Sequence, residues 1–112
     1  MTAREPKHWR TAPLPDEAWR SPPGLTPAQR RAEQDLAAGG PDKRRVLNDD
    51  GRTFTGSVAL RRYAQGRKAW AYLRYSVDGT TRERYLGEAS ENSRAANLAV
   101  AWARAHDRGY TG

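Results

Sequence analysis

The chain has 112 residues, with 20 Lys or Arg and 13 Asp or Glu, so it fits one small domain with a net charge of +7. It contains no cysteine and only two histidines, which excludes disulfide scaffolds, zinc–thiolate sites and thiol catalysis. A chain this basic is attracted to polyanions, and nucleic acid is the first partner class to consider.

Composition divides the chain near residue 54. All seven prolines lie within the first 41 residues, whereas the alternating apolar pattern starts at Phe54. We therefore expect a proline-rich N-terminal arm over residues 1–53 and a folded nucleic-acid-binding domain over residues 54–108. No regular secondary structure is expected before Gly24.

One short helix is expected within the arm, over about residues 26–38. Thr26 can cap it, Pro27 suits its first position and Gln29 completes a capping box. Gly39 follows its end. Trp9 and Trp19 precede the helix, and we expect them to pack on the domain. The alternative is an arm that docks on a partner or lies along nucleic acid.

Three strands are expected after the arm. Apolar residues at even spacing from Phe54 to Leu60 indicate the first strand, and residues 68–77 alternate strictly, which is the strongest strand pattern in the chain. A turn after residue 77 and a third strand over residues 81–86 complete an antiparallel meander.

The turn length decides which side chains share a face, because a slip of one residue moves a whole strand's side chains to the other face. A two-residue turn at residues 78–79 would put Arg82 and Arg84 on the apolar face. A three-residue loop over residues 78–80 instead places Tyr85 there and both arginines opposite. We choose the loop, because it keeps arginine out of the core. The exposed face would then carry Arg61, Trp70, Tyr72, Arg74, Arg82 and Arg84.

A long C-terminal helix is expected from about Glu91 to Arg108, with Ser90 as its cap and Gly109 as its stop. Trp102 would anchor it on the sheet. Its apolar stripe comprises Ala95, Leu98, Ala99, Trp102 and Ala105 or His106. The predicted fold class is thus α+β: a three-stranded antiparallel meander packed on one C-terminal helix, with an N-terminal arm that contains one short helix.

A family resemblance rests on short motifs between Gly56 and Gly87. They are Gly56-Ser57-Val58, Gly66-Arg67-Lys68, Trp70-Ala71-Tyr72-Leu73-Arg74-Tyr75, and Asp78-Gly79 with Arg82, Arg84 and Leu86-Gly87, and an Ala-rich helix follows them. With this pattern, residues 56–108 resemble the arm-type DNA-binding domain of tyrosine-recombinase integrases. The resemblance implies that the exposed sheet face enters the DNA major groove, with contacts from Arg61, Arg74, Arg82 and Arg84. We do not extend it to recombination.

Catalytic motifs are not recognisable in the chain. There is no glycine-rich phosphate loop of the usual spacing and no assembled Ser-His-Asp set. Asp49-Asp50 precedes Gly51 and indicates a turn rather than a metal site, and we interpret His106 as a structural residue. We expect no enzyme activity, no cofactor and no bound metal.

The exposed face predicts a non-catalytic DNA-binding protein with an accessory or regulatory role. Double-stranded DNA is the preferred partner, and RNA or single-stranded nucleic acid, which Trp70 and Tyr72 could stack on, is the alternative. Protein interaction through the arm stays open as well. Further backbone contacts are expected from Arg67, Lys68, Lys43, Arg44 and Arg45. We expect neither a membrane span nor a signal peptide, and a cytoplasmic location, nucleoid-associated if the source is bacterial.

Overall fold

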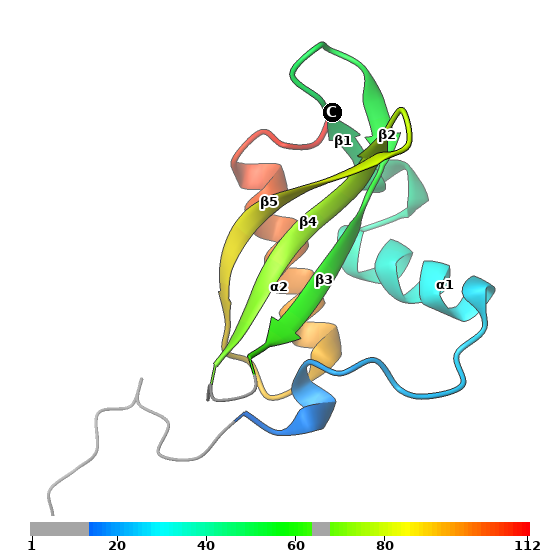
Figure 1. Cartoon of the computed structure of the whole chain (residues 1–112). Coiled ribbons are helices and arrows are strands. Elements are labelled where there is room, and N and C mark those ends of the chain that lie inside the picture. Colours follow the sequence, from blue (N-terminus) through cyan, green and yellow to red (C-terminus); the bar gives the residue numbers. More distant parts are fainter. Residues whose placement is uncertain (1–13, 64–67) are drawn as a thin grey trace, which may run out of the picture.

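A computed structural model describes residues 14–63 and 68–112 and shows an α+β fold with two antiparallel sheets, β1-β2 and β3-β4-β5. The elements are η1 (Asp16–Ala18), α1 (Pro27–Ala38), η2 (Pro41–Arg44), β1 (Arg45–Leu47), β2 (Thr53–Thr55), β3 (Ser57–Arg62), β4 (Ala69–Val77), β5 (Thr80–Ala89) and α2 (Arg94–Asp107). Helix α2 lies behind the three-stranded sheet and α1 lies beside β3 (Figure 1). We call the sheet face against α2 the inner face and the opposite one the outer face.

The predicted meander and C-terminal helix are confirmed. Strand β4 buries alternate residues from Ala69 to Val77 on the inner face, as its sequence pattern predicts. Trp102 of α2 is 0% exposed and packs against that face. Burial of so large a side chain is a main source of stability in a domain of this size.

Two details of the C-terminal helix differ from the prediction. The cap is Ser93 and not Ser90, because the Ser93 hydroxyl accepts a hydrogen bond from the Ala96 amide at 3.2 Å. Ala95 and Ala99 are exposed. The buried stripe instead comprises Asn97, Leu98, Ala101, Trp102 and Ala105.

The turn between β4 and β5 also differs from the predicted one. Val77 pairs with Thr80, so only Asp78 and Gly79 form the turn, and both have positive φ angles, of 50° and 84°. An Asp-Gly pair favours this left-handed geometry, whose twist matches that of the strands it joins. The predicted three-residue loop is therefore wrong.

The shorter turn places Arg82 and Arg84 on the inner face, where they lie opposite Tyr75 and Leu73. We expected such a register to bury arginine. It does not, because β5 is an edge strand, from which Arg82 is exposed and Arg84 reaches Asp49 at 3.3 Å.

A β-bulge changes the register again further along β5. Tyr72 pairs with Tyr85 but Ala71 pairs with Gly87, so Leu86 is an extra residue and is fully buried. Gly87 has a φ of 110°, which favours glycine at this position. Beyond the bulge the pairing is the one that the three-residue loop would have produced, which explains why the apolar pattern supported that loop.

The hydrophobic core continues across the predicted domain boundary at residue 54. Leu14, Ala18, Ala38 and Val46, all from the predicted arm, are buried in one cluster with the inner face and α2. A small sheet and one helix bury little apolar surface by themselves, and the arm adds to this area.

Part of the predicted arm is regular. Residues 16–18 form a single 3-10 turn, which corrects the expectation of no regular structure before Gly24 over the described part of that range. Residues 1–13, and with them Trp9, lie outside the described residues.

The first predicted strand is divided at Gly56. Its beginning, β2, pairs with β1, which the sequence pattern did not indicate, and only β3 joins the meander. A side chain at Gly56 would collide with Val46, so glycine permits the close approach of β1 to the sheet. The β1-β2 hairpin covers one end of the inner face, with the Phe54 ring stacked 6.3 Å from that of Tyr75.

Helix α1 confirms the predicted short helix. Thr26 and Gln29 form the capping box, with hydrogen bonds of 3.1 and 2.8 Å, and Gly39 ends the helix with a φ of 99°. Gln34 links α1 to β3 and α2 by hydrogen bonds. Its side-chain amide donates to the Val58 carbonyl at 3.0 Å, and its oxygen accepts from the Val58 amide at 2.9 Å and from Trp102 Nε1 at 3.0 Å.

Candidate nucleic-acid interface

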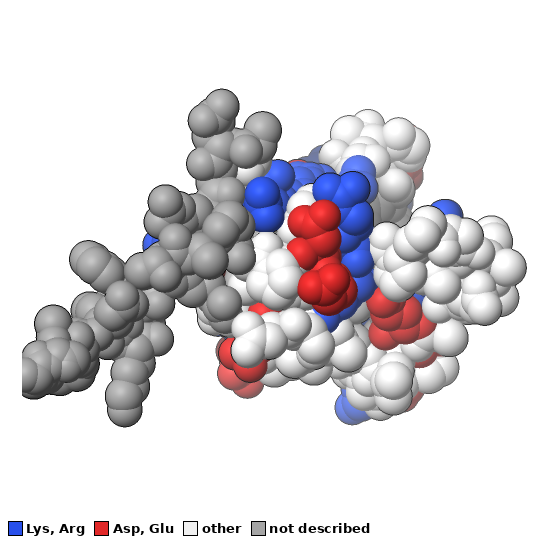
Figure 2. Space-filling view, turned by 90° about the horizontal axis from the view of Figure 1, so that it is seen from below, with Lys and Arg blue, Asp and Glu red and all other residues white. Residues whose placement is uncertain are grey.

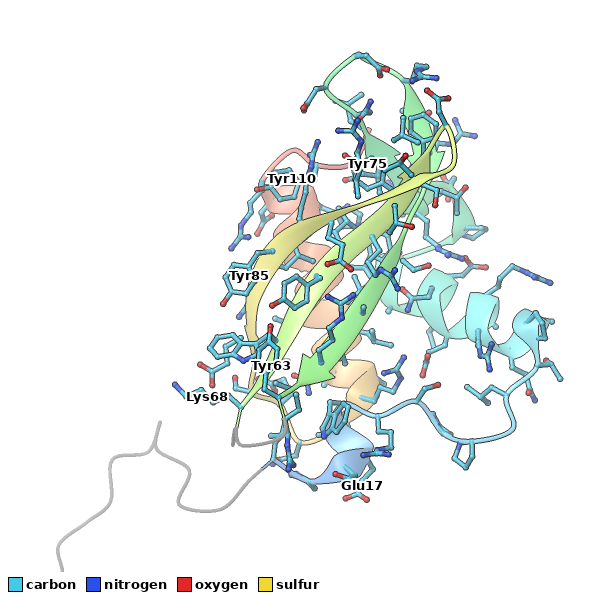
Figure 3. All side chains as sticks on the ribbon, in the orientation of Figure 1. Glu17, Tyr63, Lys68, Tyr75, Tyr85 and Tyr110 are labelled. Carbon is cyan, nitrogen blue, oxygen red and sulfur yellow. The ribbon has the colours of Figure 1, made fainter. Side chains whose placement is uncertain are left out.

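Four aromatic side chains gather on the outer face, and we call Tyr63, Trp70, Tyr72 and Tyr85 the aromatic platform. The ring of Tyr85 lies 6.1 Å from that of Trp70 and 5.6 Å from that of Tyr72. Tyr63 is 59% and Tyr85 51% exposed. Figure 3 shows Tyr63 and Lys68 near the lower end of the sheet and Tyr85 about midway along it, away from β1 and β2.

Alternation along the strands positions the platform. Trp70 and Tyr72 alternate with the buried alanines of β4, and the pairing of Tyr72 with Tyr85 brings the third ring from β5. Tyr63 follows β3, and its hydroxyl lies 3.2 Å from that of Tyr72. This hydrogen bond raises the pKa of Tyr72 above its ordinary value, because it stabilises the neutral phenol. The rings therefore form one contiguous surface, on which Tyr63 and Tyr85 are exposed and Trp70 and Tyr72 are partly exposed.

Two arginines share one carboxylate beside the platform. Arg61 Nη1 donates to Glu83 Oε1 at 2.9 Å and its second nitrogen to the other oxygen, while Arg74 Nε lies 2.9 Å from Glu83 Oε2. These contacts, first of all the hydrogen bond from Arg61, hold the pKa of Glu83 below its ordinary value, and the same bond raises the pKa of Arg61. The Arg61 guanidinium also lies 4.8 Å from the centre of the Tyr72 ring.

Among the described residues, the outer face is only slightly basic. Lys68 lies 3.7 Å from Glu88, so the three cations Arg61, Lys68 and Arg74 face two carboxylates. Acidic and basic side chains also adjoin at the lower end of the molecule (Figure 2). The predicted face combined four arginines with Trp70 and Tyr72, whereas the outer face carries aromatic rings with interleaved ion pairs.

Two predicted site residues are not on this face. The guanidinium of Arg84 lies 5.6 Å from the centre of the Tyr75 ring and 4.8 Å from that of Tyr110, and it pairs with Asp49 on the β1–β2 connection. Arg82 is exposed on the same inner side and forms no ion pair within the described residues. Neither can act together with Arg61 and Arg74 as predicted.

One arginine of the basic run at residues 43–45 has a structural role. Arg44 is buried and donates to Asp35 at 2.9 Å, to the Gly56 carbonyl at 2.9 Å and to the Ser57 hydroxyl at 3.0 Å. It cannot reach nucleic acid, which corrects its predicted role. Lys43 and Arg45 are exposed, whereas Arg67 lies outside the described residues.

Sequence reasoning missed Tyr63, Glu83 and Tyr85 as members of this surface. The signal was the Asp-Gly turn, because a two-residue turn places Glu83 and Tyr85 on the same side as Tyr72. We rejected it to avoid buried arginine, and the edge position of β5 removes that objection.

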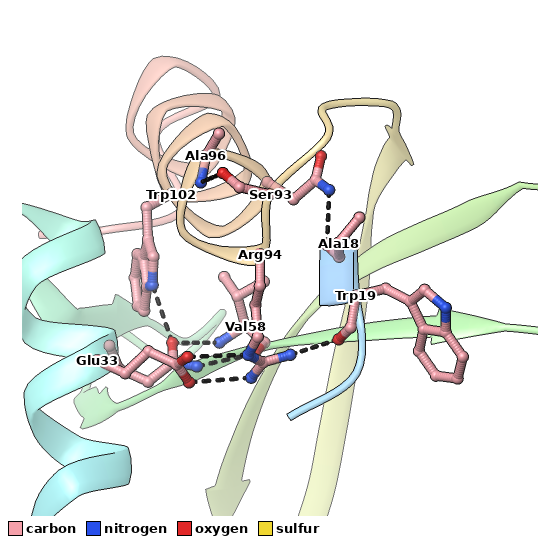
Figure 4. A network of polar contacts seen from close by, with 10 residues as sticks. Ala18, Trp19, Glu33, Val58, Ser93, Arg94, Ala96 and Trp102 are labelled. Carbon is pink, nitrogen blue, oxygen red and sulfur yellow. Dashed lines mark hydrogen bonds and ion pairs between the residues drawn. The ribbon is translucent and has the colours of Figure 1, made fainter. Parts of the chain in front are cut away.

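Trp19 is partly buried and has contacts within the domain. It packs against the core, and its ring lies 4.9 Å from the guanidinium of Arg20. The backbone carbonyl of Trp19 accepts a hydrogen bond from Arg94, whose guanidinium also binds Glu33 at 2.9 and 3.0 Å (Figure 4). Packing on the domain, which the sequence favoured for this tryptophan, is what the structure shows.

Comparison of the chain with protein-family models, curated proteins and solved structures gave no match. Over residues 14–63 and 68–112 no His, Cys, Asp or Glu side chains group by three in a way that could hold a metal ion. Neither helix in this part of the chain combines the length and the apolar character needed to cross a membrane. A function is therefore argued from the outer face.

Proposed function

We propose that this chain is a non-catalytic nucleic-acid-binding protein that contacts its target with the outer face of β3-β4-β5. The observation that carries the proposal is the aromatic platform, on which two of the rings are more than half exposed. A contiguous patch of large aromatic side chains on a protein surface usually marks an interaction site, whereas single exposed apolar side chains are common and need no explanation. With this role we expect a cytoplasmic location, or association with the nucleoid if the source is bacterial.

Unpaired bases fit this surface best. Every base has a flat face that stacks on Tyr or Trp, and sheet-borne aromatic side chains are a common way to hold single-stranded RNA or DNA. Arg61 and Lys68 lie at the margin of the platform, where they can contact phosphates or stack on a base. The preferred ligand is therefore a single strand.

Double-stranded DNA is the second candidate, and the position of Arg61 and Arg74 favours it. Glu83 holds both side chains in fixed positions on neighbouring strands, which suits contacts to base edges. Three strands spaced about 4.8 Å apart also match a major groove about 12 Å wide. The resemblance of residues 56–108 to integrase arm-type domains points to the same face.

Equilibrium binding of a labelled single strand and of its duplex, each measured over a range of salt, tests the proposal. We expect Tyr85→Ala to weaken single-strand binding by about 1 to 3 kcal/mol, the range for loss of one stacked base. Tyr85→Phe keeps the ring and should bind nearly as the parent protein does. Binding to neither ligand, or binding that does not weaken with salt, would contradict the proposal.

Preference for the duplex would select the second candidate. Arg74→Ala should then lose about 1 to 3 kcal/mol and relax the preference at one base pair. Arg82→Ala removes the same charge from the inner face and serves as its control.

A further inference from the structure

An open groove of about 810 Å³ runs between α1 and the edge of β3. Residues of α1 line it on one side and β3 on the other, and Trp19 and Arg20 also belong to its lining. The groove opens onto the outer face, because Ser57 and Arg74, which pair with each other across β3 and β4, belong to its lining.

The groove exists because only part of α1 is docked. Residues 27–32 are all exposed, and the helix first meets the sheet at the buried Gln34, whose amide occupies both backbone groups of Val58. The capping box at Thr26 stabilises the free end, which receives little support from packing. Two turns of α1 thus stand beside the sheet without covering it.

The charges in the groove are unevenly paired. Arg44 and Arg94 are held by Asp35 and Glu33, and Arg74 is held by Glu83. Arg30 and Arg31, on the free turns of α1, form no ion pair among the described residues. Arg20 reaches Asp16 only at 3.7 Å, and both side chains are 61% exposed, so this contact is weak.

We propose that this groove holds the sugar-phosphate backbone of the strand whose bases stack on the aromatic platform, with Arg30 and Arg31 as the phosphate contacts. The inference rests on the function proposed above and extends its site from the outer face around the edge of β3. Arg74 lines the groove and lies on the outer face, so the two surfaces adjoin there. The carboxylates beside this junction are paired, Glu83 with Arg61 and Arg74, and Glu33 of the groove lining with Arg94. Unpaired arginines beside a phosphate-binding face suit a polyanion through charge complementarity.

The inference predicts an effect that depends on strand length. A strand of about 4 nucleotides can occupy the platform alone, whereas one of about 12 nucleotides can also enter the groove, within the site sizes known for single-strand binders. The variant with both Arg30→Ala and Arg31→Ala should bind the short strand as the parent protein does. With the long strand, the slope of log affinity against log salt should shrink by about 1.4, since each phosphate contact on a single strand contributes about 0.7.

Labelled oligothymidine of both lengths is the probe, and circular dichroism verifies that the variant is folded. The variant with both Lys43→Ala and Arg82→Ala loses the same charge outside the groove and should keep the parent's slope. An unchanged slope for the Arg30 and Arg31 variant with the long strand overturns the inference and leaves the proposed function standing. If the parent protein binds neither length, the single-strand candidate and the groove inference fail together, and the proposed function then depends on duplex binding alone. An equal decrease of the salt slope in both double variants also overturns the groove inference, because the decrease then follows from net charge alone.

Discussion

The two faces of the three-stranded sheet carry similar chemistry and differ in what covers them. On the inner face Arg84 lies over Tyr75 and Tyr110 and pairs with Asp49, while on the outer face Arg61 lies over Tyr72 and pairs with Glu83. Helix α2 and the β1-β2 hairpin cover the inner face, and no described element covers the rings of the outer face. The inner face is structural because other elements pack on it, and the outer face is the candidate binding surface because its rings stay uncovered by the described elements; the residue types of the two faces are similar.

Two tryptophans on opposite faces give the largest expected contrast. Trp102→Ala should lower the free energy of unfolding by about 3 to 5 kcal/mol, because it removes a fully buried ring and leaves a cavity. Trp70→Ala, on the outer face, should cost about 1 kcal/mol. Urea unfolding of both variants measures the difference, and similar losses would break the distinction between the two faces.

A smaller loss of stability is expected at Gln34, which joins α1 to β3 and to α2. Gln34→Leu keeps much of the side-chain volume but leaves both backbone groups of Val58 and the indole nitrogen of Trp102 without their partner. We expect a loss of about 1 to 3 kcal/mol in unfolding free energy, the range for an unpaired buried polar group. The exposed Leu36 of the same helix supplies the control, since Leu36→Ala should leave the urea midpoint nearly unchanged.

On the outer face, substitution should change binding more than stability. Glu83→Gln removes the charge that holds Arg61 and Arg74, so the affinity for a single strand should rise. The salt slope should steepen by about 0.7 for each phosphate that is newly contacted, with a stability cost of at most about 1 kcal/mol. Asp107→Asn makes the same change in charge on α2, and an equal gain there would show that only net charge matters.

The smallest effect on stability is expected at the ion pairs that join the β1–β2 connection to the β4–β5 turn. Arg52 contacts Asp50 at 2.8 Å and Asp78, in the β4–β5 turn, at 3.2 Å. The hydrogen bond from the Arg52 side chain lowers the pKa of Asp50 from 3.8 to about 2. Because the folded pKa lies below the unfolded one, this stabilisation is present above pH 3.8 and is lost as the pH falls toward 2.

Thermal melts at several pH values between 5 and 2 test whether stability falls with pH as expected. The parent protein should lose slightly more stability over the acid range than Asp50→Asn, which lacks the titrating group. A larger loss in the variant would contradict the assignment. Because these groups are exposed, the difference should be small.

Much of the fold was predictable because its signals are local. The alternation of β4, the Thr26 capping box and the burial of Trp102 each follow from residues close together in the chain. The candidate site was predicted less well. Arg61, Trp70, Tyr72 and Arg74 were placed on the outer face correctly, since they belong to β3 and to the strongly patterned β4.

The residues of β5 were misplaced because one stretch of sequence supports two registers. The turn fixes one register at Tyr85, and the bulge at Leu86 converts it to the other before Gly87. A pattern that assumes a single register along the strand cannot represent both. The choice of the longer loop satisfied the end of the strand and misassigned Arg82 and Arg84.

The sequence by itself determined the order of the main elements, the apolar stripe of β4 and the basic, cysteine-free character that directs attention to nucleic acid. Only the tertiary structure decided that Leu14 and Val46 belong to the core, that Arg44 is structural and that Glu83 sits between two arginines. The physical reason is range. Capping, turns and alternation act between near neighbours, whereas burial and ion pairing join residues that are far apart in the chain and are fixed only once the sheet has its register and its cover.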